Sequence, residues 1–111
     1  MRLLIAEDEV LIAMQLEVEL EELGCDIAAV TATLDETKVK VAGGGFDAAI
    51  LDIDLCGEDV FPAAHDLARR GIPFVFYSGH ALREDIAEHF PDHRVFSKPT
   101  PVRILLDAVS G

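Results

Sequence analysis

The length, composition and charge of the chain set the first limits on its class. Its 111 residues have a mass of 12.1 kDa, which is enough for one domain and too little for two. Half of the residues are hydrophobic, so the chain can build a core despite a formal net charge of −12. This charge argues against nucleic-acid binding through a basic surface, because phosphates would meet a strongly negative protein.

Cysteine usage and the absence of long apolar runs add expectations about the environment. Cys25 and Cys56 occur in a sequence in which no signal peptide is recognised, which predicts a cytoplasmic protein with reduced thiols. No apolar run approaches the ~20 residues that a membrane-spanning helix needs, so we expect no membrane insertion. We expect a single domain over residues 1–111, with no output domain.

Short apolar runs alternate along the chain with segments that carry a helical apolar stripe. In chain order we predict a strand at residues 2–6, a helix at 10–23, a strand at 27–30, a helix at 33–41, a strand at 48–51, a helix from Pro62 to Gly71, a strand at 74–77, a helix at 82–90, a strand at 94–97 and a helix from Pro101 to 109. This alternation predicts an α/β fold, in which a doubly wound, five-stranded parallel sheet has helices on both faces.

The segment at residues 10–23 has the most ambiguous pattern. Residues 16–20 alternate between apolar and acidic side chains, as a strand would, yet Ile12, Leu16 and Leu20 share one helical face. A composition rich in Leu, Glu and Met and a following glycine favour the helix.

Polar residues follow four of the five predicted strands. In an open parallel sheet, the functional crevice lies beyond the carboxyl ends of the strands. The residues at these ends are Glu7, Asp8 and Glu9 after the first strand, Asp52 and Asp54 after the third, Ser78 and His80 after the fourth, and Lys98 and Pro99 after the fifth. We therefore expect acids, a hydroxyl and an ammonium group to meet in one small pocket.

This set of side chains suits Mg²⁺ and a phosphoryl group. Crowded carboxylates need a compensating cation, and Mg²⁺ is held by one or two carboxylates together with waters and phosphate oxygens. A carboxylate can also act as a nucleophile and form an aspartyl phosphate. We assign Asp52 as the nucleophile, and Asp8 with Glu7 to the metal. Lys98 and Ser78 would then contact the phosphoryl oxygens.

From end to end, the sequence resembles the receiver domains of two-component response regulators, the CheY-like family. The matching residues are the acids Glu7 and Asp8, Asp52 after an apolar strand, Ser78, and Lys98-Pro99, which resembles the cis peptide of the family. The resemblance implies a flavodoxin-like (βα)5 fold with strand order 2-1-3-4-5. It also implies a signalling domain rather than an enzyme. Such a domain accepts a phosphoryl group from a histidine kinase or phosphotransfer protein and acts on a downstream protein partner.

The same resemblance implies roles for individual residues around the phosphoacceptor. Asp8 and Asp52 would bind Mg²⁺ directly, with the backbone carbonyl of Asp54 as a third protein ligand. Glu7, which is one methylene longer than the commoner aspartate, would bind directly or through water. Asp54 and His80 would tune the lifetime of the phosphoryl group.

Residues 76–81, Phe-Tyr-Ser-Gly-His-Ala, resemble the Phe-Ala-Thr-Gly-x-Tyr motif of a stand-alone receiver subfamily. Its members are known chiefly from alphaproteobacteria, often in stress or phosphorelay signalling. Here Tyr77 replaces the alanine, a serine replaces the threonine, and Ala81 replaces the final tyrosine. Val95 also stands where many receivers carry an aromatic switch residue. We therefore hypothesise that His80 or Tyr77 takes part in the switch instead.

Two alternative functions remain open on the sequence. The first is a haloacid dehalogenase-type phosphatase, because Asp52-Ile53-Asp54 follows an apolar strand and precedes a serine and Lys98. Those phosphatases carry the aspartate pair on the first strand, however, and Glu7 and Asp8 would have no role. The second is a degenerate receiver that binds partners without phosphorylation, against which the full set of acids, hydroxyl and lysine argues.

Two further features carry weaker signals. His89 and His93 have a metal-like spacing, but Pro91 between them breaks the helix that such a pair needs, so we do not predict a metal site there. Acidic residues crowd the helix at 10–23, for which a solvated face is the default interpretation. In the family this helix often docks the kinase.

Overall fold

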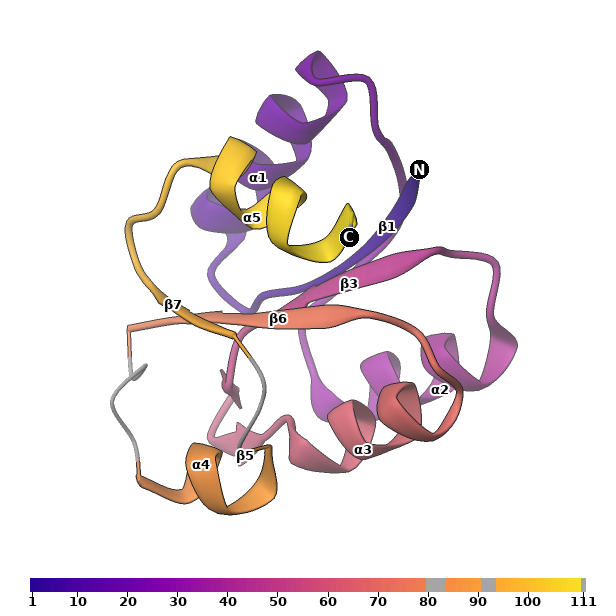
Figure 1. The fold of residues 1–111 in the computed structure, drawn as a ribbon, viewed down its shortest axis with the longest axis vertical. Coiled ribbons are helices and arrows are strands. Elements are labelled where there is room, and N and C mark those ends of the chain that lie inside the picture. The colour runs from indigo at the N-terminus through magenta and orange to yellow at the C-terminus, as the bar shows by residue number, and fades with distance from the viewer. Residues whose placement is uncertain (80–83, 91–93, 111) are drawn as a thin grey trace.

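A parallel sheet lies at the centre of the computed structural model, which describes residues 1–79, 84–90 and 94–110 (Figure 1). Its strands are β1 (Arg2–Ala6), β2 (Asp26–Thr31), β3 (Ala48–Leu51), β6 (Phe74–Ser78) and β7 (Val95–Ser97). They lie in the order β2-β1-β3-β6-β7, and each neighbouring pair is parallel. Counted as sheet strands along the chain, this is the order 2-1-3-4-5. The predicted flavodoxin-like, doubly wound fold is therefore confirmed.

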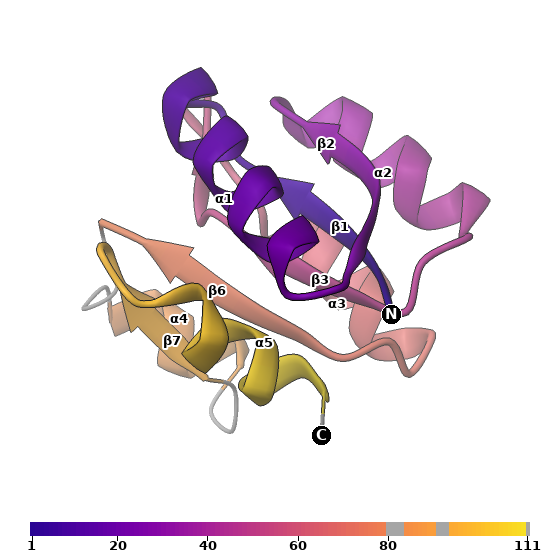
Figure 2. The same cartoon turned by 90° about the horizontal axis from the view of Figure 1, so that it is seen from above.

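Helices cover both faces of the sheet, as predicted. On one face lie α1 (Val10–Glu22) and α5 (Val102–Ser110). On the other lie α2 (Leu34–Gly43), α3 (Phe61–Arg69) and α4 (Glu84–His89), and the turned view in Figure 2 shows α1 and α5 together on the near side of the strands. The sheet thus has two cores, one on each side.

The alternation of side chains along β1 shows why two cores form. Leu3 and Ile5 pack in the core under α1 and α5, whereas Leu4 and Ala6 pack in the core on the side of α2 and α3. Successive residues of a strand point to opposite faces, so a continuous apolar run serves both layers. The apolar runs in the sequence therefore correspond to the central strands β1, β3 and β6.

The helix boundaries agree with the predictions to within a few residues. The ambiguous segment at 10–23 is a helix, and Gly24 follows it with φ +91°, a conformation that glycine adopts without steric cost. At the start of α2, Thr33 Oγ1 accepts from the N–H of Glu36 at 3.1 Å, and the Glu36 carboxylate accepts from the N–H of Ala32 at 3.0 Å. The predicted helix at 82–90 appears as α4, and residues 80–83 lie outside the described part of the chain.

The sequence predicts a loop through Gly57 between Asp52 and α3, but the structure differs there. It contains a short antiparallel hairpin of β4 (Asp54–Leu55) and β5 (Glu58–Asp59). Its two turn residues, Cys56 and Gly57, have φ +53° and +86°, which is the backbone sign that a tight two-residue hairpin requires. Gly57 is a residue typical of such a turn, but Cys56 beside it does not indicate one.

Candidate phosphoacceptor site

The predicted acids meet at the carboxyl ends of β1 and β3. These strands are neighbours, and Ala6 pairs with Leu51. The residues that follow therefore emerge at the same edge of the sheet, where the N–H of Asp52 donates to the carbonyl of Ala6 at 2.8 Å. Carboxylate oxygens of Glu7, Asp8 and Asp52 lie within 4.8 Å of one another. The register of two buried strands thus creates the acidic cluster.

Lys98 reaches this cluster from the end of β7. Its backbone N–H donates to the carbonyl of Ser78 at 3.2 Å. Its Nζ donates to Glu7 Oε1 at 2.5 Å and to Asp52 Oδ2 at 3.1 Å. The Lys98 side chain is 17% exposed, whereas those of Glu7 and Asp52 are 2% and 8% exposed. One ammonium group therefore bridges two almost buried carboxylates.

Burial and neighbouring charges shift the pKa values of Glu7 and Lys98. Burial raises the pKa of Glu7 to about 7, and the charge of Asp52 acts in the same direction, against hydrogen bonds from Lys98 and the N–H of Glu9. For Lys98, burial lowers the pKa, but the hydrogen bonds to Glu7 and Asp52 outweigh it and leave the pKa raised. Lys98 therefore stays charged at neutral pH.

The β4–β5 hairpin fixes Asp8, the third acid of the cluster. The N–H of Cys56 donates to Asp8 Oδ2 at 3.0 Å, and within the hairpin the N–H of Gly57 donates to Asp54 Oδ1 at 2.8 Å. The N–H of Asp54 in turn lies 3.5 Å from Asp52 Oδ1. The bond between Cys56 and Asp8 joins residues that are 48 positions apart in the chain. Sequence reasoning missed this contact because nothing in the sequence links the hairpin to Asp8.

A cavity of about 280 Å³ opens over the acids and Lys98. Its lining comprises Asp8, Glu9, Asp52, Asp54, Ser78, Gly79 and Lys98. Ser78 is fully buried at the wall. Most of the residues that the sequence placed at four strand ends therefore share one pocket. Glu7 and Pro99 do not line it, and His80 lies outside the described residues. The volume has room for a small cation with its waters and for a phosphoryl group.

Both carboxylate oxygens of Glu7 are engaged beneath this cavity. Oε1 accepts from Lys98, and Oε2 accepts from the N–H of Glu9 at 3.1 Å. Glu7 does not line the cavity, although its carboxylate belongs to the acidic cluster. Its role as a metal ligand is therefore more compatible with contact through water than with direct coordination.

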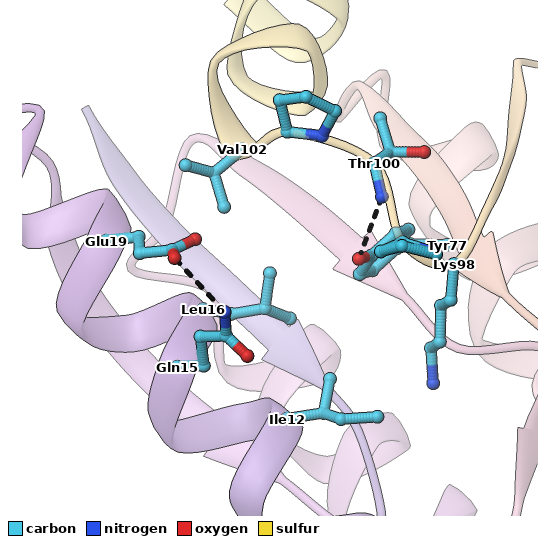
Figure 3. Close-up of a pocket in the computed structure, with 10 residues that line it drawn as sticks. Ile12, Gln15, Leu16, Glu19, Tyr77, Lys98, Thr100 and Val102 are labelled. Carbon is cyan, nitrogen blue, oxygen red and sulfur yellow. Dashed lines mark hydrogen bonds between the residues drawn. The ribbon is translucent and has the colours of Figure 1, made fainter.

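Tyr77 links the end of β6 to the segment after Lys98. The peptide bond between Lys98 and Pro99 is cis. Two residues beyond Lys98, the N–H of Thr100 donates to the buried Tyr77 hydroxyl at 3.2 Å (Figure 3). Lys98 Nζ also lies 5.8 Å from the centre of the Tyr77 ring. Tyr77 therefore contacts the lysine and holds the segment that carries it.

A second cavity, of about 500 Å³, lies beside this tie between α1 and the segment that enters α5 (Figure 3). Ile12, Leu16 and Glu19 of α1 line one side, and Tyr77 and Val102 line the other. The cavity thus adjoins the acidic cluster through Lys98 and Tyr77.

Solved structures place this arrangement in a family. The chain matches no protein-family model and no curated protein. The solution structure of SdrG from Sphingomonas melonis Fr1 is 39% identical, with a TM-score of 0.83 over 99% of this chain and 96% of that one. The REC domain of the response regulator PhyR from Erythrobacter litoralis is 30% identical, with a TM-score of 0.80 over 98% and 88%. This chain belongs to the response regulator receiver domains.

A further receiver structure supports the assignment. A response regulator receiver protein from Sinorhizobium medicae WSM419 has a TM-score of 0.86 at 25% identity over 98% of this chain and 90% of that one. The receiver fold and these similar signalling domains favour the predicted signalling role over a phosphatase. Within the described residues, no helix is long and apolar enough to cross a membrane.

Proposed function

We propose that this receiver domain accepts a phosphoryl group on Asp52 in a Mg²⁺-dependent reaction. The observation that carries the proposal is the contact of Lys98 Nζ with Asp52 Oδ2 in a cavity that Asp8 and Ser78 also line. A nucleophile, a fixed cation, a hydroxyl and a second acid are the groups that phosphoryl transfer to a carboxylate requires.

In this proposal Asp8 and Asp52, with the backbone carbonyl of Asp54, bind the Mg²⁺. Glu7 contributes negative charge and contacts the ion through water, since both of its carboxylate oxygens already accept hydrogen bonds. The ion supplies positive charge that offsets the phosphoryl oxygens. Carboxylates of three residues within 4.8 Å of one another form the hard, oxygen-only donor set that Mg²⁺ prefers.

The transfer itself uses groups of this chain. A carboxylate oxygen of Asp52 attacks the phosphorus of a phosphohistidine, the P–N bond breaks, and the electron pair stays on the imidazole nitrogen, which takes up a proton. Lys98 and Ser78 contact the phosphoryl oxygens and stabilise their charge. Hydrolysis by water later restores the carboxylate, and Asp54 and His80 tune the rate of that step.

One similar structure supports this proposal from outside the chain. It is described as the BeF3-activated conformation of SdrG, is 41% identical, and has a TM-score of 0.79 over 96% of this chain and 93% of that one. Beryllium trifluoride on a carboxylate has the shape and charge of a phosphoryl group. A protein with a similar chain is therefore activated by a mimic of the modification that we propose for Asp52.

An apolar stripe on α1 supports a helical phosphodonor as partner. Val10, Leu11, Met14 and Val18 share one side of the helix and are 54–81% exposed. An exposed apolar helix face marks a protein–protein contact, and it borders the strand end that holds Glu7 and Asp8. We propose that a histidine kinase or phosphotransfer protein docks here. The phosphorylated domain would then signal in the cytoplasm by contact with a downstream protein.

Intact-mass measurement after incubation with a small phosphodonor and Mg²⁺ tests the phosphoacceptor. We expect the mass of one phosphoryl group on the unmodified sequence, no addition on Asp52→Ala, and no addition when the metal is chelated. Labelling of Asp52→Ala to the same extent would overturn the assignment of the residue. No labelling of the unmodified sequence would overturn the proposal itself.

A substitution on the stripe separates docking from chemistry. Leu11→Ser removes the most exposed apolar side chain of α1. We expect slower phosphotransfer from a phosphorylated kinase and unchanged labelling by the small phosphodonor. Equal rates from the kinase would contradict the docking surface and leave the phosphoacceptor assignment standing.

A further inference from the structure

Two histidines join α3 to α4 on the face of the sheet opposite α1 and α5. His65 Nε2 of α3 and His89 Nδ1 of α4 are 3.0 Å apart, although 24 positions separate them in the sequence. Both side chains are exposed. His93, which has a metal-like spacing from His89 in the sequence, lies outside the described residues. The partner that the fold supplies is His65.

Aromatic rings hold both imidazoles in place. His89 stacks on Phe61, with ring centroids 4.6 Å apart and an angle of 24° between the planes. His65 lies against Phe90, with centroids 4.6 Å apart and an angle of 33°. Both phenylalanines belong to the buried core. Contact with these buried rings therefore restricts the orientation of both imidazoles. This restriction lowers the entropy cost of binding one ligand through both nitrogens.

The two facing nitrogens lie close to the separation that a shared ion requires. In the hydrogen-bonded pair one proton lies between them. If each neutral imidazole instead carries its proton on its remote nitrogen, both lone pairs face the same point. With Zn–N bonds of about 2.0–2.1 Å, two nitrogens on a tetrahedral ion lie about 3.3 Å apart. A lengthening of a few tenths of an ångström, with a turn of the rings that directs both lone pairs at the ion, therefore converts the pair into a chelate, and no proton is released.

We propose that His65 and His89 form a two-histidine site for a borderline transition-metal ion, such as Zn²⁺ or Ni²⁺, with waters as the other ligands. Imidazole nitrogens favour these ions, whereas Mg²⁺ prefers oxygen donors. The site is thus chemically distinct from the carboxylates at the strand ends. A bound ion ties α3 to α4 and stabilises the position of α4, which has only six residues.

Titration calorimetry with Zn²⁺ and with Ni²⁺ in the presence of excess Mg²⁺ tests this site, because Mg²⁺ occupies the oxygen donors first. We expect one ion per chain. His65→Gln and His89→Gln each weaken binding at least about tenfold, since even the loss of outer-shell partners costs that much. His80→Gln and Cys56→Ser are the matched controls, and they retain binding because they remove another histidine and the exposed thiol.

Two further readouts separate ligation from folding. Zn²⁺ raises the melting temperature of the unmodified chain and not that of His65→Gln, because an ion that binds only the folded state stabilises it. Zn²⁺ also shifts the ¹⁵N signals of His65 and His89 together. No binding in excess Mg²⁺, or binding that both pair variants retain, would overturn the site. All measurements are repeated on Asp52→Ala, so that their outcome does not depend on the phosphoacceptor function.

Discussion

The two sides of the proposed phosphoacceptor site are held by different kinds of contact. On the side of β1 and β3, backbone groups fix the acids: Asp52 follows a strand that is hydrogen-bonded to its neighbour, and Asp8 accepts from the N–H of Cys56. On the side of β6 and β7, side chains do most of this work. Lys98 is held by two carboxylates, and the segment beyond it by the hydroxyl of Tyr77.

This difference shows which side responds to a new charge. The register of buried strands leaves the acids no alternative position, because a slip would turn the apolar side chains out of the core. The ammonium group of Lys98 sits on a flexible stem, and its bonds to Glu7 and Asp52 exist only while those carboxylates are charged and free of other cations. We therefore expect substitutions on the side of β6 and β7 to alter stability and signalling, even where they remove only one charge or one hydroxyl group.

We expect the largest effect from removal of the positive charge of Lys98. Lys98→Met leaves Glu7 and Asp52 almost buried without their common cation. We expect the free energy of unfolding at pH 8 to fall by about 3–5 kcal/mol, the cost of breaking a buried ion pair on one side. Urea unfolding measures the change, and Lys38→Met, at an exposed position of α2, is the matched control with little effect.

Added Mg²⁺ distinguishes lost charge from lost packing in this variant. If the lysine matters as a cation, millimolar Mg²⁺ restores part of the stability of Lys98→Met and adds less to the unmodified chain. Equal stability of Lys98→Met and the unmodified chain would show that the acids do not depend on this bridge.

The raised pKa of Glu7 gives the next largest effect, and it depends on pH. The pKa rises from 4.5 to about 7 on folding, so the folded state binds the proton more tightly than the unfolded state. The stability from this proton is fully present below pH 4.5 and is lost as the pH rises through 7. At about 1.4 kcal/mol per pKa unit, the full change is about 3 kcal/mol or less.

Glu7→Gln removes this titration. We expect the unfolding free energy of the unmodified chain to fall between pH 5 and pH 8 by about 2–3 kcal/mol more than that of Glu7→Gln. Glu21→Gln, an exposed acid of α1, controls for the general effect of one charge fewer. Parallel pH profiles for Glu7→Gln and the unmodified chain would mean that burial does not hold a proton on Glu7.

The sequence predicts those parts of the molecule that depend on one element at a time. Apolar runs place the strands, and the rule that parallel sheets carry their sites at the carboxyl ends of strands brings Asp8, Asp52, Ser78 and Lys98 to one edge. The acidic cluster and the cavity follow from that placement, whereas the sheet order was implied by the resemblance to receiver domains. The cluster and the cavity need only the direction of a strand and the residue after it.

Contacts between elements far apart in the chain could not be predicted in this way. The β4–β5 hairpin and its bond to Asp8, and the pair of His65 and His89, depend on how loops and helices pack after the sheet has formed. Tyr77 was considered as a switch residue because of its place beside Ser78, but its bond to Thr100 was not foreseen. Its partner is a backbone N–H, which carries no mark in the sequence.

The tie between Tyr77 and Thr100 gives the smallest of the three effects. Tyr77→Phe keeps the buried ring and removes only the oxygen that accepts the Thr100 N–H. We expect a loss of about 1 kcal/mol in unfolding free energy, the usual value for one hydrogen bond. We also expect faster hydrogen exchange at Thr100, because its N–H loses its acceptor while the strands stay folded.

If the lysine side is held by side chains as we infer, the lifetime of the phosphoryl group changes as well, since Lys98 lies on the same segment. Unaltered exchange at Thr100 would show instead that the cis Lys98–Pro99 segment keeps its place without Tyr77, and that both sides of the site are fixed by the backbone.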